Sequence, residues 1–267
     1  MDALVFAAGR GTRLRPYTDT TPKPLLDVGG QPILTRCLRA ITAAGVDRIV
    51  LVVGYRGEAI VEHIGDSFRG VPVVYAHQDD RKGLAHAVLT AAEALEREGF
   101  DGETGTENDV LTVNGDNVFD CDLSPLLERH RESDADGTVL LDRVSRNEAE
   151  TAALCDLESD GTIRTLESTR DPDSSTRESA DSAVSGTPTP GYLAAGVQTH
   201  SADLFEACRA VDRGESGEYE LADALQLLVD RGRRYVGVEL EGWHLNINTP
   251  ADLTAARAHF ADESETG

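Results

Sequence analysis

Lysine is nearly absent from this 267-residue sequence, in which only 2 of the 25 Lys and Arg residues are Lys. Acidic residues are abundant instead, and 48 Asp and Glu give a formal net charge of −23. Such a field repels phosphate backbones and anionic lipids, so neither nucleic acid nor a membrane is expected as a partner. A carboxylate-rich, lysine-poor surface is typical of extreme halophiles, because it stays solvated in concentrated salt. We therefore expect poor stability at low salt.

Cysteine is scarce, and no two of the four are close in sequence. Without a CxxC pair or a Cys/His ligand spacing, neither a zinc site nor a disulfide framework is indicated. Long apolar runs are also missing, since no window approaches about 18 apolar residues, so no transmembrane helix is expected. The N-terminus is acidic where a secretory signal would be basic. The sequence thus predicts a cytoplasmic protein.

What the sequence does contain is an alternation of buried strands and amphipathic helices. Residues 3–8 form a continuous apolar run, typical of a strand covered on both faces, and residues 48–53 (RIVLVV) are predicted to be the next buried strand. Between them Pro32 opens a helical pattern that Gly45 ends. The alternation continues with helices at 58–64 and 84–96 and strands at 71–75 and 110–113. This order predicts an α/β protein with a Rossmann-like, mostly parallel sheet and helices on both faces.

The second half of the chain is less regular. Short apolar stretches predict antiparallel strands, which makes the sheet mixed, and three helices follow. Two polar segments, 101–108 and 168–190, are predicted to be mobile surface loops. The expected strands are 138–141, 152–157, 162–166 and 192–197, and the expected helices are 202–210, 221–231 and 251–260.

A glycine-rich turn, Gly9-Arg10-Gly11-Thr12-Arg13, follows the first strand. Glycines there let backbone N–H groups approach a phosphate closely, which makes this turn a candidate phosphate cradle. It is not the dinucleotide fingerprint, because Leu14 stands where the third glycine belongs, nor a Walker A loop, because no Gly-Lys-Ser/Thr follows. An ordinary turn is the simpler alternative.

One of the two lysines, Lys23, lies between Pro22 and Pro24. The prolines predict a stiff, extended backbone that holds this ammonium in place. A solvated surface lysine is the alternative, but this composition would favour arginine there. A functional Lys23 is therefore the preferred interpretation.

A second candidate group follows the fourth strand, at Asn114-Gly115-Asp116-Asn117. Ligands gather at the carboxyl ends of parallel strands, and a carboxylate there suits Mg2+ held partly through substrate phosphates. A turn or a helix cap would explain Asp116 equally well.

Taken together, six motifs resemble those of the sugar-1-phosphate nucleotidylyltransferases, most closely the short glucose-1-phosphate thymidylyl- and uridylyltransferases. The resemblance covers residues 3–258 and implies that a nucleoside triphosphate and a sugar 1-phosphate give a nucleotide sugar and pyrophosphate, assisted by Mg2+. The motifs are GxGTRLxP from residue 9, PKP at 22–24, GLAHA at 83–87, NGDN at 114–117, GEYELAD at 217–223 and GWHLNINTPADL at 242–253.

The resemblance also implies roles for single residues. Arg13, Lys23 and Asp116 would be catalytic, and Asp116 and Asn246 would hold the metal. One domain, 1–260, would comprise a nucleotide-binding half, 1–122, and a sugar-binding half, 123–260, before an acidic tail, 261–267. The nucleotide would contact Ala8, Gly9, Gly11, Thr12, Arg13, Gln78 and Gly83. Of these, Gln78 and Gly83 would read the nucleobase, and Ala8 would lie close to it. The sugar phosphate would contact Gly115, Glu167, Arg170, Tyr192 and Gly196.

The sequence departs from the family pattern at three places. Asn246 stands where an aspartate is common, residues 152–153 replace an aromatic-glycine motif, and a Glu-Lys-Pro motif is missing, with Arg170 as the substitute for its lysine. UTP or dTTP and glucose 1-phosphate are the favoured substrates. A catalytically weak nucleotide-sugar-binding or regulatory paralogue is the alternative, an NAD-dependent oxidoreductase is a distant third, and a homo-oligomer is left open.

Overall fold

The computed structural model describes residues 1–80, 82–97, 108–144, 155–166, 191–214, 217–239 and 241–261. The loop predicted at 168–190, the tail from residue 262 and all but Asn108 of the loop predicted at 101–108 lie outside these ranges. In the described part of the chain, no helix has both the length and the apolar character needed to cross a bilayer.

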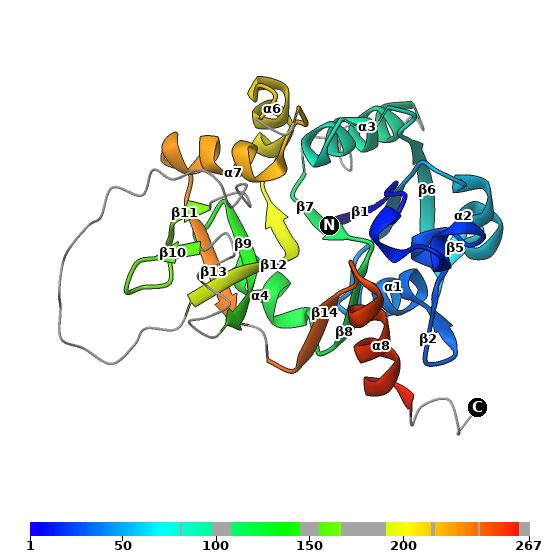
Figure 1. Ribbon diagram of the computed structural model, residues 1–267. Coiled ribbons are helices and arrows are strands. Elements are labelled where there is room, and N and C mark those ends of the chain that lie inside the picture. The colour runs from blue at the N-terminus through cyan, green and yellow to red at the C-terminus, as the bar shows by residue number, and fades with distance from the viewer. Residues whose placement is uncertain are drawn as a thin grey trace.

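An eight-stranded sheet runs through the molecule (Figure 1). Strands β7, β1, β4 and β6 are parallel, β12 is antiparallel to both of its neighbours, and β13 is parallel to β9. The predicted mostly parallel, mixed sheet is confirmed. In order across the sheet the strands are β13 (Tyr235–Glu239), β9 (Gly137–Val144), β12 (Gly191–His200), β7 (Val110–Asn114), β1 (Asp2–Ala7), β4 (Arg48–Val53), β6 (Val71–His77) and β5 (Ser67–Phe68).

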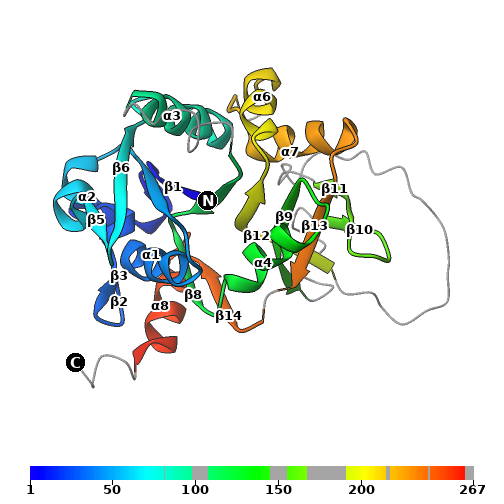
Figure 2. The ribbon, with the colours of Figure 1, turned by 180° about the vertical axis from the view of Figure 1, so that it is seen from behind.

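Helices cover both faces of this sheet, because the central strands are apolar on both sides. Along β1, Leu4 and Phe6 enter one core cluster and Ala3 and Val5 the other. The first cluster packs under α3 (Leu84–Arg97), α6 (Asp203–Ala210) and α7 (Leu221–Asp230). The second packs on α1 (Ile33–Ala43), α2 (Gly57–Ile64) and α4 (Ser124–Glu132). Figures 1 and 2 show α3, α6 and α7 along one side of the sheet, away from α1 and α4.

Helix α4 is not among the predicted helices. Its buried face consists of Leu126, Leu127 and His130, too few apolar positions for a helical period to stand out. Strand β8 (Asn117–Asp120) was also not predicted, and it pairs with β14 (Trp243–Asn246) in a separate two-stranded ribbon. Two further small pairs are β2 (Asp27–Val28) with β3 (Gln31–Pro32), and β10 (Cys155–Leu157) with β11 (Ile163–Leu166).

A third apolar cluster joins the end of the chain to its beginning. Helix α8 (Pro250–His259) contributes Leu253, and the residue that follows it, Phe260, belongs to the same cluster. Both are in one cluster with Leu14, which lies just after the glycine-rich turn. Trp243 stacks on His259, with ring centroids 3.9 Å apart, so this tryptophan helps to dock α8. The C-terminal helix therefore supports the loops that follow β1.

Candidate active site

The chain places β4 and then β6 on one side of β1, and afterwards returns to place β7 on the other side of β1. The order in which the chain adds strands to the sheet therefore reverses between β1 and β7. In open α/β sheets this reversal opens a crevice beyond the carboxyl ends of the strands, where ligands bind. A cavity of about 410 Å³ lies there, between the turn after β1 and the loop after β7. Its lining residues are Phe6, Ala7, Ala8, Gly9, Gly11, Thr12, Arg13, Lys23, Pro24, Gln78, Gly83, Leu84, Ala87, Asn114, Gly115, Asp116, Glu218 and Asn248.

The glycine-rich turn forms one wall of the cavity. Gly11 has a φ of +63°, and a Cβ there would lie 2.8 Å from the Cβ of Lys23. The Thr18 hydroxyl donates a hydrogen bond to the Gly11 carbonyl, at 2.8 Å. Gly9 and Arg13 are exposed to solvent in this wall. A glycine is thus required where the turn packs on the lysine, and the backbone stays accessible to a ligand.

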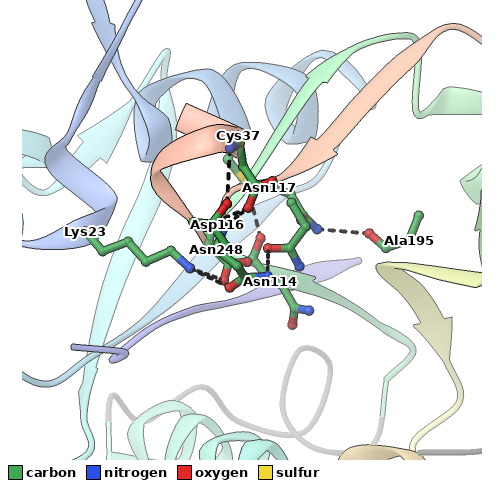
Figure 3. Close-up of polar contacts among 10 residues, drawn as sticks. Lys23, Cys37, Asn114, Asp116, Asn117, Ala195 and Asn248 are labelled. Carbon is green, nitrogen blue, oxygen red and sulfur yellow. Dashed lines mark hydrogen bonds and ion pairs between the residues drawn. The ribbon is translucent and has the colours of Figure 1, made fainter. Parts of the chain in front are cut away.

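Lys23 begins a short 3-10 helix, Lys23–Leu25. The extended backbone predicted for Lys23 is wrong, because the Leu26 amide donates to the Lys23 carbonyl and the Leu25 amide donates to that of Pro22. The residue is 7% exposed, and its ammonium reaches the cavity. Nζ lies 2.7 Å from Asp116 Oδ2 and 3.1 Å from Asn248 Oδ1 (Figure 3).

The loop after β7 carries Asp116 to this ammonium. The Gly115 amide donates to the Phe6 carbonyl, and a Cβ on Gly115 would lie 2.8 Å from that oxygen, so only glycine fits beside the end of β1. Asp116 Oδ1 is buried and has no hydrogen-bond partner in the part of the chain that the structure describes. Burial and the Asp116 charge raise the pKa of the Cys37 thiol below the loop, so that thiol is neutral at pH 7.

Asn248 is a cavity residue that the sequence analysis did not select. Its side-chain amide donates to Asn246 Oδ1 at 2.9 Å, and its backbone amide donates to Asp252 Oδ2. Asp252 and Thr249 form the capping box of α8, which fixes the loop. The alternation Asn246-Ile247-Asn248 was a usable signal, since residues two apart in an extended segment share a face.

Gln78 and Gly83 also line the cavity, between the end of β6 and the start of α3. In the sheet, β6 is separated from β7, which leads to Asp116, by β1 and β4. Gly83 has a φ of +101°, and a Cβ there would lie 2.4 Å from the Tyr219 carbonyl oxygen. The backbones cross-link around it, because the Ala85 amide donates to the Tyr219 carbonyl and the Tyr219 amide to the Lys82 carbonyl. Segments about 135 residues apart in sequence thus hold this corner rigid.

The structure brings together most of the residues selected from the sequence, but not all. Ala8, Gly9, Gly11, Thr12, Arg13, Lys23, Gln78, Gly83, Gly115 and Asp116 all line the cavity. Asn246 does not, and reaches it through Asn248. Glu167 and Arg170 lie outside the described residues.

Two of the residues predicted to contact the sugar phosphate, Tyr192 and Gly196, lie in β12. The Tyr192 hydroxyl donates to Glu239 Oε1, and Tyr192 is not among the cavity residues. Gly196, with a φ of +73°, approaches Asn114, where a Cβ would lie 2.7 Å from Nδ2. Gly196 therefore shapes the cavity from behind its Asn114 wall.

Comparison with known proteins agrees with this geometry. The family described as "Nucleotidyl transferase" matches residues 2–263. The chain belongs to the nucleotidyl transferase family. It is 35% identical to "UTP--glucose-1-phosphate uridylyltransferase AglF" of Haloferax volcanii, over 99% of this chain and 98% of that protein. It is 31% identical to a "Glucose-1-phosphate thymidylyltransferase" of Streptomyces griseus, over 95% of this chain and 64% of that one.

Other relatives of this nucleotidyl transferase are longer. The "Bifunctional protein GlmU" of Methanococcus maripaludis is 30% identical over 98% of this chain, which spans 55% of it. Among solved structures, a "Putative Glucose-1-Phosphate Thymidylyltransferase from Bacillus anthracis" shares the fold with a TM-score of 0.78 and 23% identity, over 98% of this chain and 96% of that one.

Proposed function

We propose that this chain is a sugar-1-phosphate nucleotidylyltransferase that uses UTP or dTTP and glucose 1-phosphate. The products would be the nucleotide sugar and pyrophosphate. One observation supports this most strongly: Lys23 and Asp116 meet 2.7 Å apart in a cavity beside the glycine-rich turn, in a chain of the nucleotidyl transferase family. The names of AglF and of the Streptomyces relative support the same substrates.

In this reaction a phosphate oxygen of the sugar 1-phosphate attacks the α-phosphorus of the nucleotide. A new P–O bond forms, the bond to the bridging β-phosphate oxygen breaks, and pyrophosphate leaves with that electron pair. Such a transfer depends on positioning and on charge stabilisation rather than on a covalent nucleophile. We assign the Lys23 ammonium to the α-phosphate, and Arg13 with the Gly9–Gly11 backbone to the triphosphate; Gly9, Gly11, Arg13 and Lys23 all line the cavity, which supports this assignment.

A divalent cation fits beside Asp116, and members of this family generally depend on one. The buried Asp116 Oδ1 lacks a donor among the described residues. Asn246 and Asn248 lie in the neighbouring segment at the end of β14, where the Ile247 amide donates to the Asp116 carbonyl. The described residues contain no group of three or more His, Cys, Asp or Glu suited to a metal. We propose Mg2+, since it is commonly held by one or two carboxylates together with substrate phosphates. When bound, it would neutralise phosphate charge.

The sugar phosphate would lie on the side of the cavity formed by β7 and β12. Gly115 lines this side, Gly196 stands behind Asn114, and Glu167, Arg170 and Tyr192 complete the proposed set. A contribution from Arg170 in place of a lysine would change the reach and geometry of the contact, because a guanidinium is a planar fork.

The test is pyrophosphate release from UTP, dTTP, CTP or GTP with a panel of sugar 1-phosphates, in high KCl with Mg2+. We expect turnover with UTP or dTTP and glucose 1-phosphate. Binding of nucleotides without product from any pair would contradict the proposal.

A catalytically weak, nucleotide-sugar-binding or regulatory paralogue is the second candidate. This candidate is favoured by Asn246, which stands where sugar-1-phosphate nucleotidylyltransferases commonly have an aspartate. The amide oxygen of asparagine carries no negative charge to offset that of a divalent cation. Product formation with any pair of substrates would exclude this candidate.

A further inference from the structure

The orientation of one side-chain amide at the base end of the cavity is fixed by its neighbours. Gln78 is 5% exposed, and its Nε2 lies 3.3 Å from the carbonyl oxygen of Gly83. A carbonyl oxygen can only accept, so the amide atom facing it must be the NH2 group. Gly83 cannot swing away, because its loop is cross-linked to Tyr219.

The same NH2 group determines the state of a histidine on the first turn of α3. Gln78 Nε2 is 2.9 Å from Nδ1 of His86. Since Nε2 donates, Nδ1 must accept, and His86 is then the neutral tautomer with its proton on the other ring nitrogen. Burial and Lys82 lower the pKa of His86, against smaller opposing effects of Glu93 and Asp80. The neutral ring is therefore the stable form at pH 7.

With its NH2 group directed at Gly83 and His86, the Gln78 amide has its oxygen left over. Oε1 makes no hydrogen bond to the described residues, and Gln78 lines the cavity. A ligand at this end of the cavity thus meets an acceptor rather than a donor. If the amide were reversed, two acceptors would face each other at Gly83 and the cavity would present a donor instead.

We propose that His86 is a positioning residue that sets nucleobase preference by holding the Gln78 oxygen toward the base. This inference rests on the proposed function and predicts a preference for bases with a ring N–H. Uracil and thymine carry a proton on N3, and guanine carries one on N1. Cytosine N3 and adenine N1 are acceptors, and either would face the Gln78 oxygen without a proton between them. A buried hydrogen-bonding group of this kind discriminates strongly between a base that can pair with it and one that cannot.

Two substitutions separate the hydrogen bond from the shape of the side chain. His86→Leu keeps a similar volume but removes the acceptor, so the amide of Gln78 is free to rotate. His86→Asn places a carbonyl oxygen near the position of Nδ1 and restores the acceptor. The kcat and KM for UTP and CTP are measured for both variants and the unaltered protein, with glucose 1-phosphate.

We expect His86→Leu to raise KM for UTP about tenfold with kcat nearly unchanged, and to reduce the UTP/CTP ratio of kcat/KM by at least that factor. His86→Asn should recover most of both. A ratio unchanged in His86→Leu, or lost equally in His86→Asn, would overturn the role of His86 while leaving the proposed function intact.

Equilibrium binding of UTP and CTP by calorimetry makes this test independent of turnover. If the unaltered protein binds UTP in preference to CTP yet forms no product, the proposed function fails and the binding ratio of the three proteins still decides the role of His86. A preference for CTP, or no binding of any nucleoside triphosphate, would overturn the inference itself.

Discussion

Lys23 Nζ and Asp116 Oδ2 lie 2.7 Å apart, although 93 residues separate them in sequence. The side chains are 9% and 28% exposed, so the pair is sheltered but borders the cavity. Each charge compensates the other, and Asn248 Oδ1 also accepts a hydrogen bond from the ammonium. A triphosphate with its cation offers both groups a stronger opposite charge, so the pair is prepared to separate onto the substrate.

Replacing Lys23 by Ala should lower kcat about 100-fold or more, because it removes one preorganised positive group from the reacting phosphate. The fold should persist, since the 3-10 helix at residues 23–25 is held by backbone hydrogen bonds. Steady-state kinetics and circular dichroism check both expectations. Arg231→Ala, which removes a half-exposed positive charge at the C-terminal boundary of α7, is the matched control. Near-normal turnover in Lys23→Ala would exclude its catalytic role.

Replacing Asp116 by Ala should abolish Mg2+-dependent activity, since the carboxylate is the charged protein ligand that we propose for the cation. A titration of initial rate against Mg2+ measures this, with Asp230→Ala on α7 as the control for loss of a surface carboxylate. An unchanged Mg2+ dependence would remove Asp116 from the metal site.

Replacing Gly83 by Ala should weaken nucleotide binding at least tenfold, because the new Cβ would lie 2.4 Å from the Tyr219 carbonyl and push the base corner apart. Gly70→Ala is a close control. Gly70 also has a positive φ, of +87°, but a Cβ there has nothing within 4 Å. Isothermal titration with UTP compares the two variants. Equal affinities would show that the Gly83 contact is irrelevant to the ligand.

The buried His200 should make the protein sensitive to acid. Its ring nitrogens lie 2.8 Å from Thr112 Oγ1 and 3.2 Å from the Tyr235 hydroxyl. Burial, with a smaller effect of His130, lowers the pKa of His200 from 6.5 to about 3. The unfolded chain therefore binds the proton more readily than the folded chain. The contribution of His200 to the free energy of unfolding is fully present above pH 6.5 and is lost as the pH falls toward 3.

The measurement is the free energy of unfolding by urea in high KCl at several pH values. His200→Gln should flatten its slope below pH 6.5 by up to one proton, about 1.4 kcal/mol per pH unit. His63→Gln, at an exposed histidine, is the control variant. Equal slopes in all three proteins would refute the assignment to His200.

The net charge of −23 should make stability depend on salt. The Debye length shortens from about 10 Å at 0.1 M to about 3 Å at 1 M, so concentrated salt removes most of the repulsion between surface carboxylates. We expect a higher melting temperature in about 3 M KCl than in about 0.1 M. Calorimetry at both concentrations checks it, and equal values would refute the halophilic interpretation.

Much of the fold was predictable because local physical rules determine it. Residues 49–53 are apolar at every position, and the structure buries them in β4 together with Arg48, which is paired with Asp2. The helix predicted between Pro32 and Gly45 is confirmed as α1 (Ile33–Ala43). Helix α4 and strand β8 escaped prediction, because their sequences are short and carry little periodicity.

The sequence by itself determined the alternation of strands and helices and the acidic surface, and it singled out Lys23 and Asp116 through composition and position in the chain. Only the tertiary structure decided that these two meet, that Asn248 rather than Asn246 faces the cavity, and that His86 orients Gln78. The physical reason is that hydrogen bonds and ion pairs depend on positions to within a fraction of an ångström. Such positions arise from packing among distant segments, which no local pattern encodes.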